Sequence, residues 1–537
     1  MSYQRPRQRL CTYGERIPSR AAMEPCEPRC LLSTSVTMWH NNSSLTAANL
    51  TETQLTLNNV NSDTFGKLRS LQVDGQVYAQ PLYVPGLKFD KHGRTVKRNM
   101  VYVATQNNTV YGYDADRGSL IWHVAAYNKA MGDKPVPAED TGSNDITPVI
   151  GITSTPVIDK STNTIYVVAS VKRGDGASAS YAQRLWAFDL KTGAKKLGGQ
   201  SIIRATVKGD GTSSVNGRIS FDPKLQLQRV ALALSRGVVY IGFGSHGDIG
   251  DYHGWLLGYS ASNITKQVAV WNNTPDGAAA GIWQSGAAPS VDSNGNLFVM
   301  NANGTFFANN GPPDFAQSIV RIPPTGGALL PADSFTPFNQ NDLTADDVGL
   351  GSTGALLLPD QSGPHPHEAV FGSKEGTIYV VDRDNLGGFD PSTNNVVQVI
   401  QPGSRKGVFM TPSYFNGQVF YSTVGGTLTS LNLRSNGTLA SSGKETTQTF
   451  SYPGPNPSIS ANGRSNGIVW ITAKRTDGRA ILQAYNAATL GDPIYTSGDA
   501  GDRDVPGGNY VKFSSPTIAD GKVIIGTGNE LVVYGLL

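Results

Sequence analysis

A group of short strands recurs along this chain, and this repetition constrains the fold more than any other feature. In the first clear copy, three segments alternate apolar and polar residues and are separated by tight turns: Val101–Thr105, Thr109–Asp114 and Leu120–Trp122. Such alternation predicts half-buried β-strands. Further copies begin at Thr164, Val238, Asn296, Thr377, Gln418, Gly467 and Lys522. Most copies open with an additional strand, so the sequence predicts an all-β protein, an eight-bladed β-propeller. A β-solenoid would show shorter and more uniform periods.

The last copy lacks a fourth strand of its own. It reaches Leu537 just after its third strand, whereas Phe65–Asp74 lies upstream of the first copy and has the alternation of a strand. We therefore expect this N-terminal strand to complete the last blade and close the ring. Residues 65–537 would then form a single β-propeller domain. A seven-bladed ring is the alternative count.

Positive charge and cysteine are concentrated before the repeats. The net charge is +3 and 16% of the residues are charged, yet the first thirty residues contain six Arg against three Glu. No basic face is expected on the remainder, which argues against a nucleic-acid partner. The three cysteines, Cys11, Cys26 and Cys30, lie in the same segment. We interpret residues 1–35 as a disordered basic tail without a visible signal peptide, and residues 36–64 as an extended N-terminal segment.

The apolar runs of this sequence are short. None approaches the roughly eighteen residues that a transmembrane helix requires, so we predict no membrane span.

Function on a propeller is expected where the copies differ. Three consecutive copies carry long connections between their second and third strands, at residues 171–183, 244–254 and 301–317, and the longest connection between blades covers residues 125–150. Loops of both kinds open onto the same end of the ring. Together they predict a cleft on that face.

Several residues in or near these loops have two interpretations each. His246, Asp248 and His253 contain metal-ligating groups, but their spacing matches no standard motif, and they suit the turns of a Gly-rich loop equally well. Trp283 is either core packing or a stacking floor for a planar ligand. Lys374 stands where other copies have neutral residues, and is either a solvated turn charge or a donor to an anionic ligand.

The segment Tyr113–Trp122, with an aromatic residue before Asp, then Arg-Gly and Trp, resembles the tryptophan-docking motif of the quinoprotein propellers. The resemblance covers nearly all of residues 65–537. It implies an eight-bladed fold that holds pyrroloquinoline quinone and usually calcium at the end of the channel, and that oxidises alcohols, aldehydes or sugars. Because one fold can host many activities, the resemblance is stronger evidence for the fold than for the activity.

The resemblance also implies roles for individual residues. Asp248 corresponds to the acidic calcium ligand, with Asp in place of the usual Glu, and Asn303 corresponds to the amide ligand at a strand end. Trp283 corresponds to the tryptophan beneath the quinone ring, and Lys374 to the basic residue that contacts the quinone oxygens. The family's catalytic base is an Asp ahead of the third strand of the Asn303 blade, and Asp314 is the nearest candidate.

Other parts of the family's site are missing. The vicinal cysteine pair of many alcohol-oxidising members is absent, as is any haem segment. The leading hypothesis is a dehydrogenase of an alcohol or sugar that depends on pyrroloquinoline quinone and calcium. The alternatives are a non-catalytic propeller that binds a glycan or protein through its loop face, and a propeller enzyme of non-redox chemistry.

We further expect a secreted monomer, because the family is mostly exported and the charge is low. Sequons for N-glycosylation occur at Asn41, Asn42, Asn49, Asn107, Asn263, Asn272, Asn303 and Asn436, a number that a chain rich in Asn, Ser and Thr yields by chance.

Overall fold

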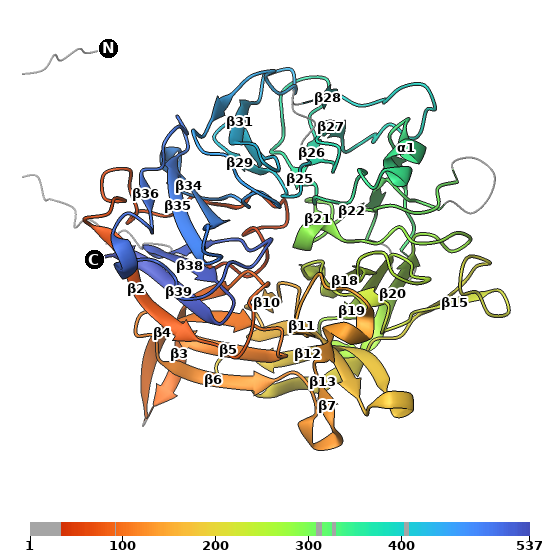
Figure 1. Ribbon diagram of the computed structural model, residues 1–537, viewed down its shortest axis with the longest axis horizontal. Coiled ribbons are helices and arrows are strands. Elements are labelled where there is room, and N and C mark those ends of the chain that lie inside the picture. The colour runs from red at the N-terminus through yellow and green to blue at the C-terminus, as the bar shows by residue number, and fades with distance from the viewer. Residues whose placement is uncertain (1–33, 92, 308–313, 325–328, 402–406) are drawn as a thin grey trace, which may run out of the picture. The chain divides into compact units, whose positions relative to one another are not determined.

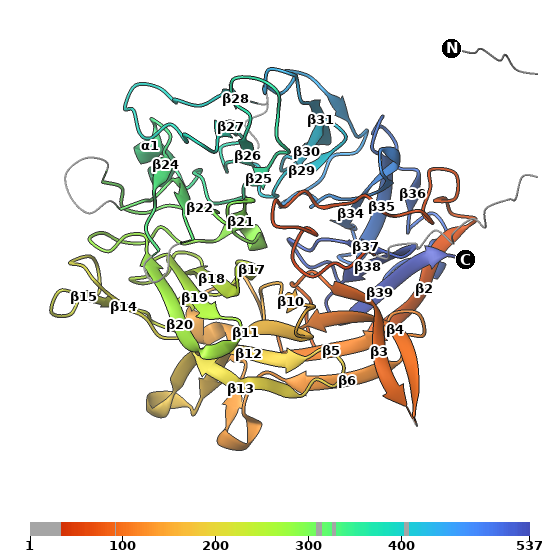
Figure 2. The same ribbon diagram turned by 180° about the vertical axis from the view of Figure 1, so that it is seen from behind.

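Small antiparallel sheets are arranged around a common centre in the computed structural model of this protein (Figures 1 and 2). The structure describes residues 34–91, 93–307, 314–324, 329–401 and 407–537. Residues 33–537 form one compact unit, whereas the predicted basic tail and the three cysteines lie outside the described residues, apart from positions 34 and 35. Eight sheets act as blades, which confirms the eight-bladed propeller and excludes the seven-bladed alternative.

Each blade is built from consecutive strands that run outward from the centre. The first three blades consist, in order, of β3 (Leu82–Lys91), β4 (Arg94–Ala104), β5 (Thr109–Asp114) and β6 (Leu120–Ala125); β10 (Val157–Asp159), β11 (Thr164–Arg173), β12 (Ser180–Asp189) and β13 (Lys195–Ile202); and β16 (Gln226–Leu227) with β17 (Ala233–Ser235), β18 (Val238–Ser245), β19 (Trp255–Ser260) and β20 (Asn263–Asn272). The fourth and fifth blades consist of β21 (Ser290–Val291), β22 (Leu297–Met300), β23 (Ile319–Ile322) and β24 (Asp333–Phe335); and of β25 (Leu356–Leu357), β26 (Glu368–Gly372), β27 (Ile378–Asp382) and β28 (Gln398–Ile400). The sixth and seventh blades consist of β29 (Ser413–Phe415), β30 (Gln418–Ser422), β31 (Leu428–Asn432) and β32 (Lys444–Glu445); and of β33 (Ser458–Asn462), β34 (Ser465–Lys474), β35 (Ala480–Asn486) and β36 (Tyr495–Thr496).

The eighth blade joins the two ends of the described chain, as the sequence predicts. It contains β37 (Thr517–Ala519), β38 (Lys522–Gly526), β39 (Glu530–Leu536) and the N-terminal strand β2 (Phe65–Gln72). β2 pairs antiparallel with β39, from Phe65 opposite Leu536 to Gln72 opposite Glu530. Apolar residues on both faces of the sheets pack between neighbouring blades, and Trp186, Trp255 and Trp470 are fully buried there. The inner strands are therefore buried on both faces, as in β5 and β11, and not half-buried as the alternation predicts.

The segment before β2 crosses the centre of the ring and hydrogen-bonds to the blades in turn. We call residues 36–52 the N-terminal strap. Its carbonyl oxygens accept backbone hydrogen bonds of 2.8–3.1 Å from the innermost parts of five blades, from Ile158 to Thr37, Val291 to Ser43, Leu357 to Ser44, Tyr414 to Thr46 and Ile459 to Ala47. Its short strand β1 (Ala48–Asn49) pairs in parallel with β33. The strap thus places Trp39 and His40 inside the ring.

One predicted loop is instead a continued hairpin. β11 extends to Arg173 and β12 begins at Ser180, and these two residues are paired, so only residues 174–179 form the turn where residues 171–183 are predicted as a long connection. The physical reason is a charge cluster, because Arg173 and Arg184 both pair with Asp133, at 2.7 and 2.9 Å, and hold the two strands together.

The remaining elements lie in the connections. They are β7 (Asp133–Lys134), β8 (Val136–Pro137), β9 (Val149–Ile150), β14 (Thr206–Lys208), β15 (Arg218–Ser220), helix α1 (Gln340–Ala345), and the short 3₁₀ helices at Lys129–Met131, Ala138–Thr141, Gly176–Ser178, Gln284–Gly286 and Gly501–Arg503. Among the described residues, no helix is both long enough and apolar enough to cross a bilayer.

Candidate functional site

A cavity of about 490 Å³ lies where the connections between blades meet the long connections within blades. Its lining residues are Asp145, Ser245, Gly247, Asp248, Gly281, Trp283, Ala302, Asn303, Asp347, Val348, Gly351, Lys374, Phe409 and Tyr452. The connections 125–150, 244–254 and 301–317 each contribute to it, as expected for a cleft on the loop face. Segments before β21, β25, β29 and β33 and the turn between β26 and β27 supply the rest of the wall.

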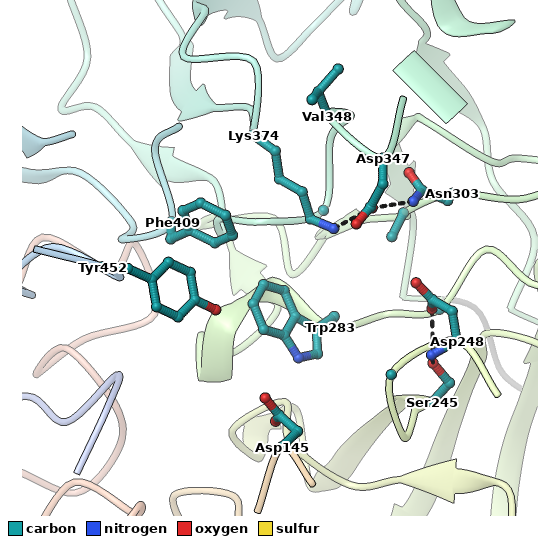
Figure 3. A pocket seen from close by; sticks show the side chains of 14 residues that line it. Asp145, Ser245, Asp248, Trp283, Asn303, Asp347, Val348, Lys374, Phe409 and Tyr452 are labelled. Atoms are coloured by element: carbon teal, nitrogen blue, oxygen red, sulfur yellow. Dashed lines mark hydrogen bonds and ion pairs between the residues drawn. The ribbon is translucent and has the colours of Figure 1, made fainter. Parts of the chain in front are cut away.

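Four of the five residues that the sequence singles out line this one cavity. Trp283, Lys374, Asp248 and Asn303 come from separate connections, and Figure 3 shows them around the same space. The convergence follows from propeller geometry, since connections at equivalent positions of successive blades reach the same end of the ring.

The indole of Trp283 is half-buried and forms part of the cavity lining. Its backbone is braced on both sides, because the Ile282 amide donates to Phe243 at 3.1 Å and the Gln284 amide donates to Gly351 at 2.9 Å. Phe409 and Phe513 meet the ring edge-on, with centroids 6.3 and 5.3 Å away. These edge contacts fix the ring plane while one part of it stays open to the cavity. Trp283 therefore contributes part of its ring to the cavity lining.

Asp347, which the sequence interpretation misses, lies at the centre of the polar side of the cavity. Its Oδ1 accepts hydrogen bonds from Lys374 Nζ, at 2.5 Å, and from Asn303 Nδ2. The backbone joins the same two segments, since the Lys374 amide donates to Gly349 at 3.0 Å and the Glu375 amide to Val348 at 2.7 Å. Lys374 is thus held by a carboxylate and is not a freely solvated turn charge.

Asn303 connects this pair to the blade behind it. Its side-chain oxygen accepts a hydrogen bond of 2.7 Å from Gln317, and its amide nitrogen is occupied by Asp347. Asn303 also begins one of the glycosylation sequons, but a nitrogen engaged in this way favours a role within the cavity.

Asp248 also lines the cavity, from a left-handed turn with φ of 59°. Its Oδ1 accepts hydrogen bonds from the hydroxyls of Ser245 and Tyr252, at 2.9 and 2.5 Å. Burial and the Asp248 charge raise the pKa of the Tyr252 hydroxyl, so it remains a donor. Oδ1 therefore holds the loop together, and no hydrogen bond among the described residues engages Oδ2.

The transition-metal interpretation of this loop is not supported by the positions of its histidines. His253 is buried, with Nδ1 3.0 Å from the Thr274 oxygen and Nε2 2.9 Å from the Thr212 oxygen. Burial lowers the pKa of His246 to about 4 although Asp145 opposes this effect. Within the part of the chain that the structure describes, no group of three or more His, Cys, Asp or Glu could hold a metal ion. The histidines support loop structure instead.

Asp145 lies on the other side of Trp283 from Lys374 in the view of Figure 3. It forms an ion pair with Lys512, and its Oδ2 is 3.8 Å from Nη1 of Arg229. Burial works against ionisation, but Arg229 and Lys512 together lower the pKa of Asp145. The cavity thus has carboxylates on two sides of its aromatic floor.

The structure does not bring Asp314 into this cavity. Asp314 is fully buried, its Oδ1 accepts a 3.3 Å hydrogen bond from the Asp276 amide, and its Oδ2 has no hydrogen-bond partner among the described residues. The physical reason is local pairing: the Phe315 amide donates to Asn273 and the Ala316 amide to Thr305. These bonds hold the segment before β23 inward, so Asp314 has no contact with the lining.

Burial raises the pKa of Asp314 to about 6, which predicts a pH dependence of stability. Because the folded pKa lies above the ordinary value, the folded state keeps a proton that the unfolded state releases. The free energy of unfolding should therefore fall as pH rises from about 4 to about 6. Asp314→Asn should remove this dependence and stabilise the protein at pH 7.5 by on the order of 1 kcal/mol. Urea denaturation of both proteins across this pH range tests the expectation, and identical pH profiles would contradict it.

Comparison with known proteins finds similar propeller folds. Residues 87–310 match a family profile described as outer membrane protein assembly factor BamB. No curated protein matches the chain in sequence. The quinohemoprotein alcohol dehydrogenase ADHIIG from Pseudomonas putida HK5 is 15% identical, with a TM-score of 0.55 over 94% of this chain and 80% of that chain.

Two further solved structures give the same result. The quinohemoprotein alcohol dehydrogenase from Comamonas testosteroni is 14% identical, with a TM-score of 0.54 over 94% of this chain and 80% of its own. A europium-containing methanol dehydrogenase is 12% identical, with a TM-score of 0.55 over 94% of this chain and 98% of its own. The resemblance to the quinoprotein-like propellers is therefore confirmed for the fold. Similarity at this level of identity is evidence for the fold and not for the activity.

Proposed function

With the quinoprotein-like propeller fold as the premise, we propose that the cavity binds pyrroloquinoline quinone together with calcium, and that the protein is a dehydrogenase of an alcohol or sugar. The observation that carries the proposal is the convergence of Trp283, Lys374, Asp248 and Asn303 on one cavity from four separate connections. An aromatic floor, a cation and oxygen ligands are the groups that a planar, anionic quinone and a hard cation require.

The residues of the cavity fit a planar quinone. The volume of about 490 Å³ lies within the range of about 300–1,000 Å³ that small-molecule sites occupy. Trp283 presents an open part of its ring, and Phe409 and Tyr452 add apolar surface beside it. Lys374 lies at the edge of the same space, where its ammonium group can donate to an anionic oxygen.

The fit to calcium depends on a bound ligand. Asp248 and Asn303 offer a carboxylate oxygen and an amide oxygen, the donors that calcium prefers. Calcium takes about six to eight oxygen ligands, so these two side chains supply part of the shell, and oxygens of the ligand and water must complete it. We therefore propose a cation that binds with the quinone and not in its absence.

The chain's own residues then divide the work of alcohol oxidation. A bound quinone supplies the two-electron acceptor that side chains lack. Asp347 is suited to take the proton of the substrate hydroxyl, because Lys374 and Asn303 hold its Oδ1, whereas no hydrogen bond within the described residues engages its Oδ2. As this proton passes to Asp347, the alcohol carbon would give a hydride to the bound acceptor and become a carbonyl carbon. Lys374 would stabilise the negative charge that the acceptor gains. We accordingly propose Asp347 as the base in place of Asp314.

A non-catalytic propeller is the second candidate. It is favoured by the family profile, whose description is that of an assembly factor and not of an oxidoreductase. The ring of Tyr452, which is 47% exposed at the rim of the cavity, offers a surface on which a glycan or a protein side chain could stack. This candidate predicts that the cavity binds no quinone.

Titration of the purified full chain with pyrroloquinoline quinone, with and without calcium, separates the two candidates. Quenching of tryptophan fluorescence reports binding, and dye-linked oxidation of a panel of alcohols and sugars reports turnover. Binding at micromolar quinone that strengthens with calcium supports the dehydrogenase. Absence of binding at that concentration overturns the dehydrogenase proposal and leaves the non-catalytic propeller as the candidate.

Trp283→Ala is expected to weaken quinone binding by about 10- to 100-fold, because stacking and burial against the indole are lost. Trp283→Phe keeps an aromatic floor and should stay within several-fold of the natural chain. Dissociation constants from equilibrium dialysis, which does not depend on tryptophan fluorescence, provide the measurement. Equal affinities for the alanine and phenylalanine variants would show that the ring does not act as the floor.

A further inference from the structure

A buried arginine near the centre of the ring lacks the partners that its charge requires. Arg229 follows β16 and is only 2% exposed. Its Nε, Nη1 and Nη2 are all buried without a hydrogen-bond partner among the described residues. Three aromatic rings surround the guanidinium, with Cζ 5.3 Å from the centroid of Tyr78, 5.7 Å from Trp283 and 4.4 Å from Phe513. Ring faces attract a cation, but they satisfy none of its N–H groups.

The charges around Arg229 do not balance. Asp145 is the carboxylate that faces it, at 3.8 Å from Nη1, and the same carboxylate forms an ion pair with Lys512. One anion therefore serves two cations. The neighbouring His246 contributes no charge near pH 7, since burial holds its pKa at about 4, and burial keeps Tyr78 protonated by raising its pKa. Arginine stays charged in proteins, so this interior region carries one excess positive charge.

A small cavity lies beside the guanidinium. It measures about 10 Å³ and is lined by Trp39, Tyr78, Thr153, Thr155, Arg229, Ser285, Gly286 and Phe513. Trp39 belongs to the N-terminal strap, and Tyr78 and Phe513 come from connections that precede the first and eighth blades. This volume accommodates one water-sized sphere and is too small for the carboxylate of a larger ligand.

A hydroxyl donor also lines this cavity. Thr155 Oγ1 accepts a 2.9 Å hydrogen bond from the Gln80 amide, and no acceptor within the described residues takes its proton. Guanidinium N–H groups and a free hydroxyl proton together form a donor set for an anion. A water molecule would satisfy some of these donors but would leave the excess charge uncompensated.

We propose that this cavity is a binding site for a monatomic anion of the size of chloride, held by the guanidinium of Arg229 with help from the hydroxyl of Thr155. The site goes beyond the proposed function, because it lies on the Arg229 side of Trp283 and needs neither quinone nor calcium. Its anion neutralises the excess charge and thereby stabilises the packing of Trp283, Phe513 and the strap around the guanidinium.

The test compares thermal unfolding of the full chain in sodium chloride and in sodium methanesulfonate at equal ionic strength. Methanesulfonate is too large for the cavity, so the unfolding midpoint should be higher in chloride by about 2 °C at a concentration well above the dissociation constant. Arg229→Met should abolish this difference. A midpoint that does not depend on the anion, or a difference that persists in Arg229→Met, overturns the proposal.

Arg383→Met is the matched control. Arg383 is also a buried arginine, but its guanidinium donates to Leu358 at 3.2 Å and lies 3.7 Å from Asp360, so its charge is compensated. This variant should keep the chloride dependence of the natural chain. Crystals of the natural chain grown in bromide provide a second measurement that requires no variant. An anomalous bromide peak beside Arg229 supports the site, and water density alone at that position overturns it.

Discussion

Asp347→Asn is expected to lower kcat of the quinone-loaded protein by at least about 100-fold, which is the range for loss of a general base. The amide has the shape of the carboxylate and can still accept a hydrogen bond from Lys374, but it cannot take the proton of the substrate hydroxyl. The quinone dissociation constant should change by less than about 10-fold, because Trp283 and Lys374 remain in place. Steady-state oxidation and equilibrium dialysis measure the two quantities separately.

Asp314→Asn is the matched control for this prediction. It makes the same chemical change in Asp314, which the sequence indicates as the candidate base ahead of β23. Asp314 is fully buried and does not line the cavity. We expect kcat close to that of the natural chain. The reverse outcome, with activity lost in Asp314→Asn and retained in Asp347→Asn, would return the role of base to Asp314. Loss of quinone binding in both variants would instead point to a change in the cavity itself.

The positions of Lys374, Asp248 and Asn303 could be predicted because each follows the end of a recognisable strand by two or three residues, whereas Trp283 lies seven residues before β21. Lys374, for example, follows β26 by two residues, and Asn303 follows β22 by three. In a propeller such offsets translate directly into a place on the loop face, since every blade repeats the same geometry. Register within the repeat, together with the resemblance to the quinoprotein propellers, was therefore sufficient to place these residues on one face.

Asp347 could not be found in this way. It lies in the long connection between β24 and β25, after helix α1, where no strand register fixes its place. The available signal was the pair Asp346-Asp347 in a connection between blades, since such connections open onto the same face as the cavity. Arg229 was hidden for a different reason. Its partners Tyr78, Trp283 and Phe513 are far apart in sequence and meet only because the ring closes.

Closure of the ring depends on one pairing between distant parts of the chain, and Phe65 fixes it. Phe65 begins β2 and is fully buried. Its ring centroid lies 5.3 Å from Trp470 and 4.9 Å from Tyr495, both in the seventh blade, and 6.3 Å from Tyr534 on β39. The side chain thus joins the closing strand both to its own sheet and to the neighbouring blade.

Phe65→Ala is therefore expected to lower the free energy of unfolding by about 3–5 kcal/mol, the usual cost of removing a buried phenylalanine from a packed core. Leu68→Ala on the same strand is the control, because Leu68 is 36% exposed and should cost less than about 1 kcal/mol. Urea denaturation followed by circular dichroism and by tryptophan fluorescence gives both values. If ring closure makes the propeller one cooperative unit, the two signals change together in the natural chain, and Phe65→Ala shifts both midpoints equally. A shift confined to one signal, or a loss no larger than that of Leu68→Ala, would mean that the other blades hold the ring without the closing strand.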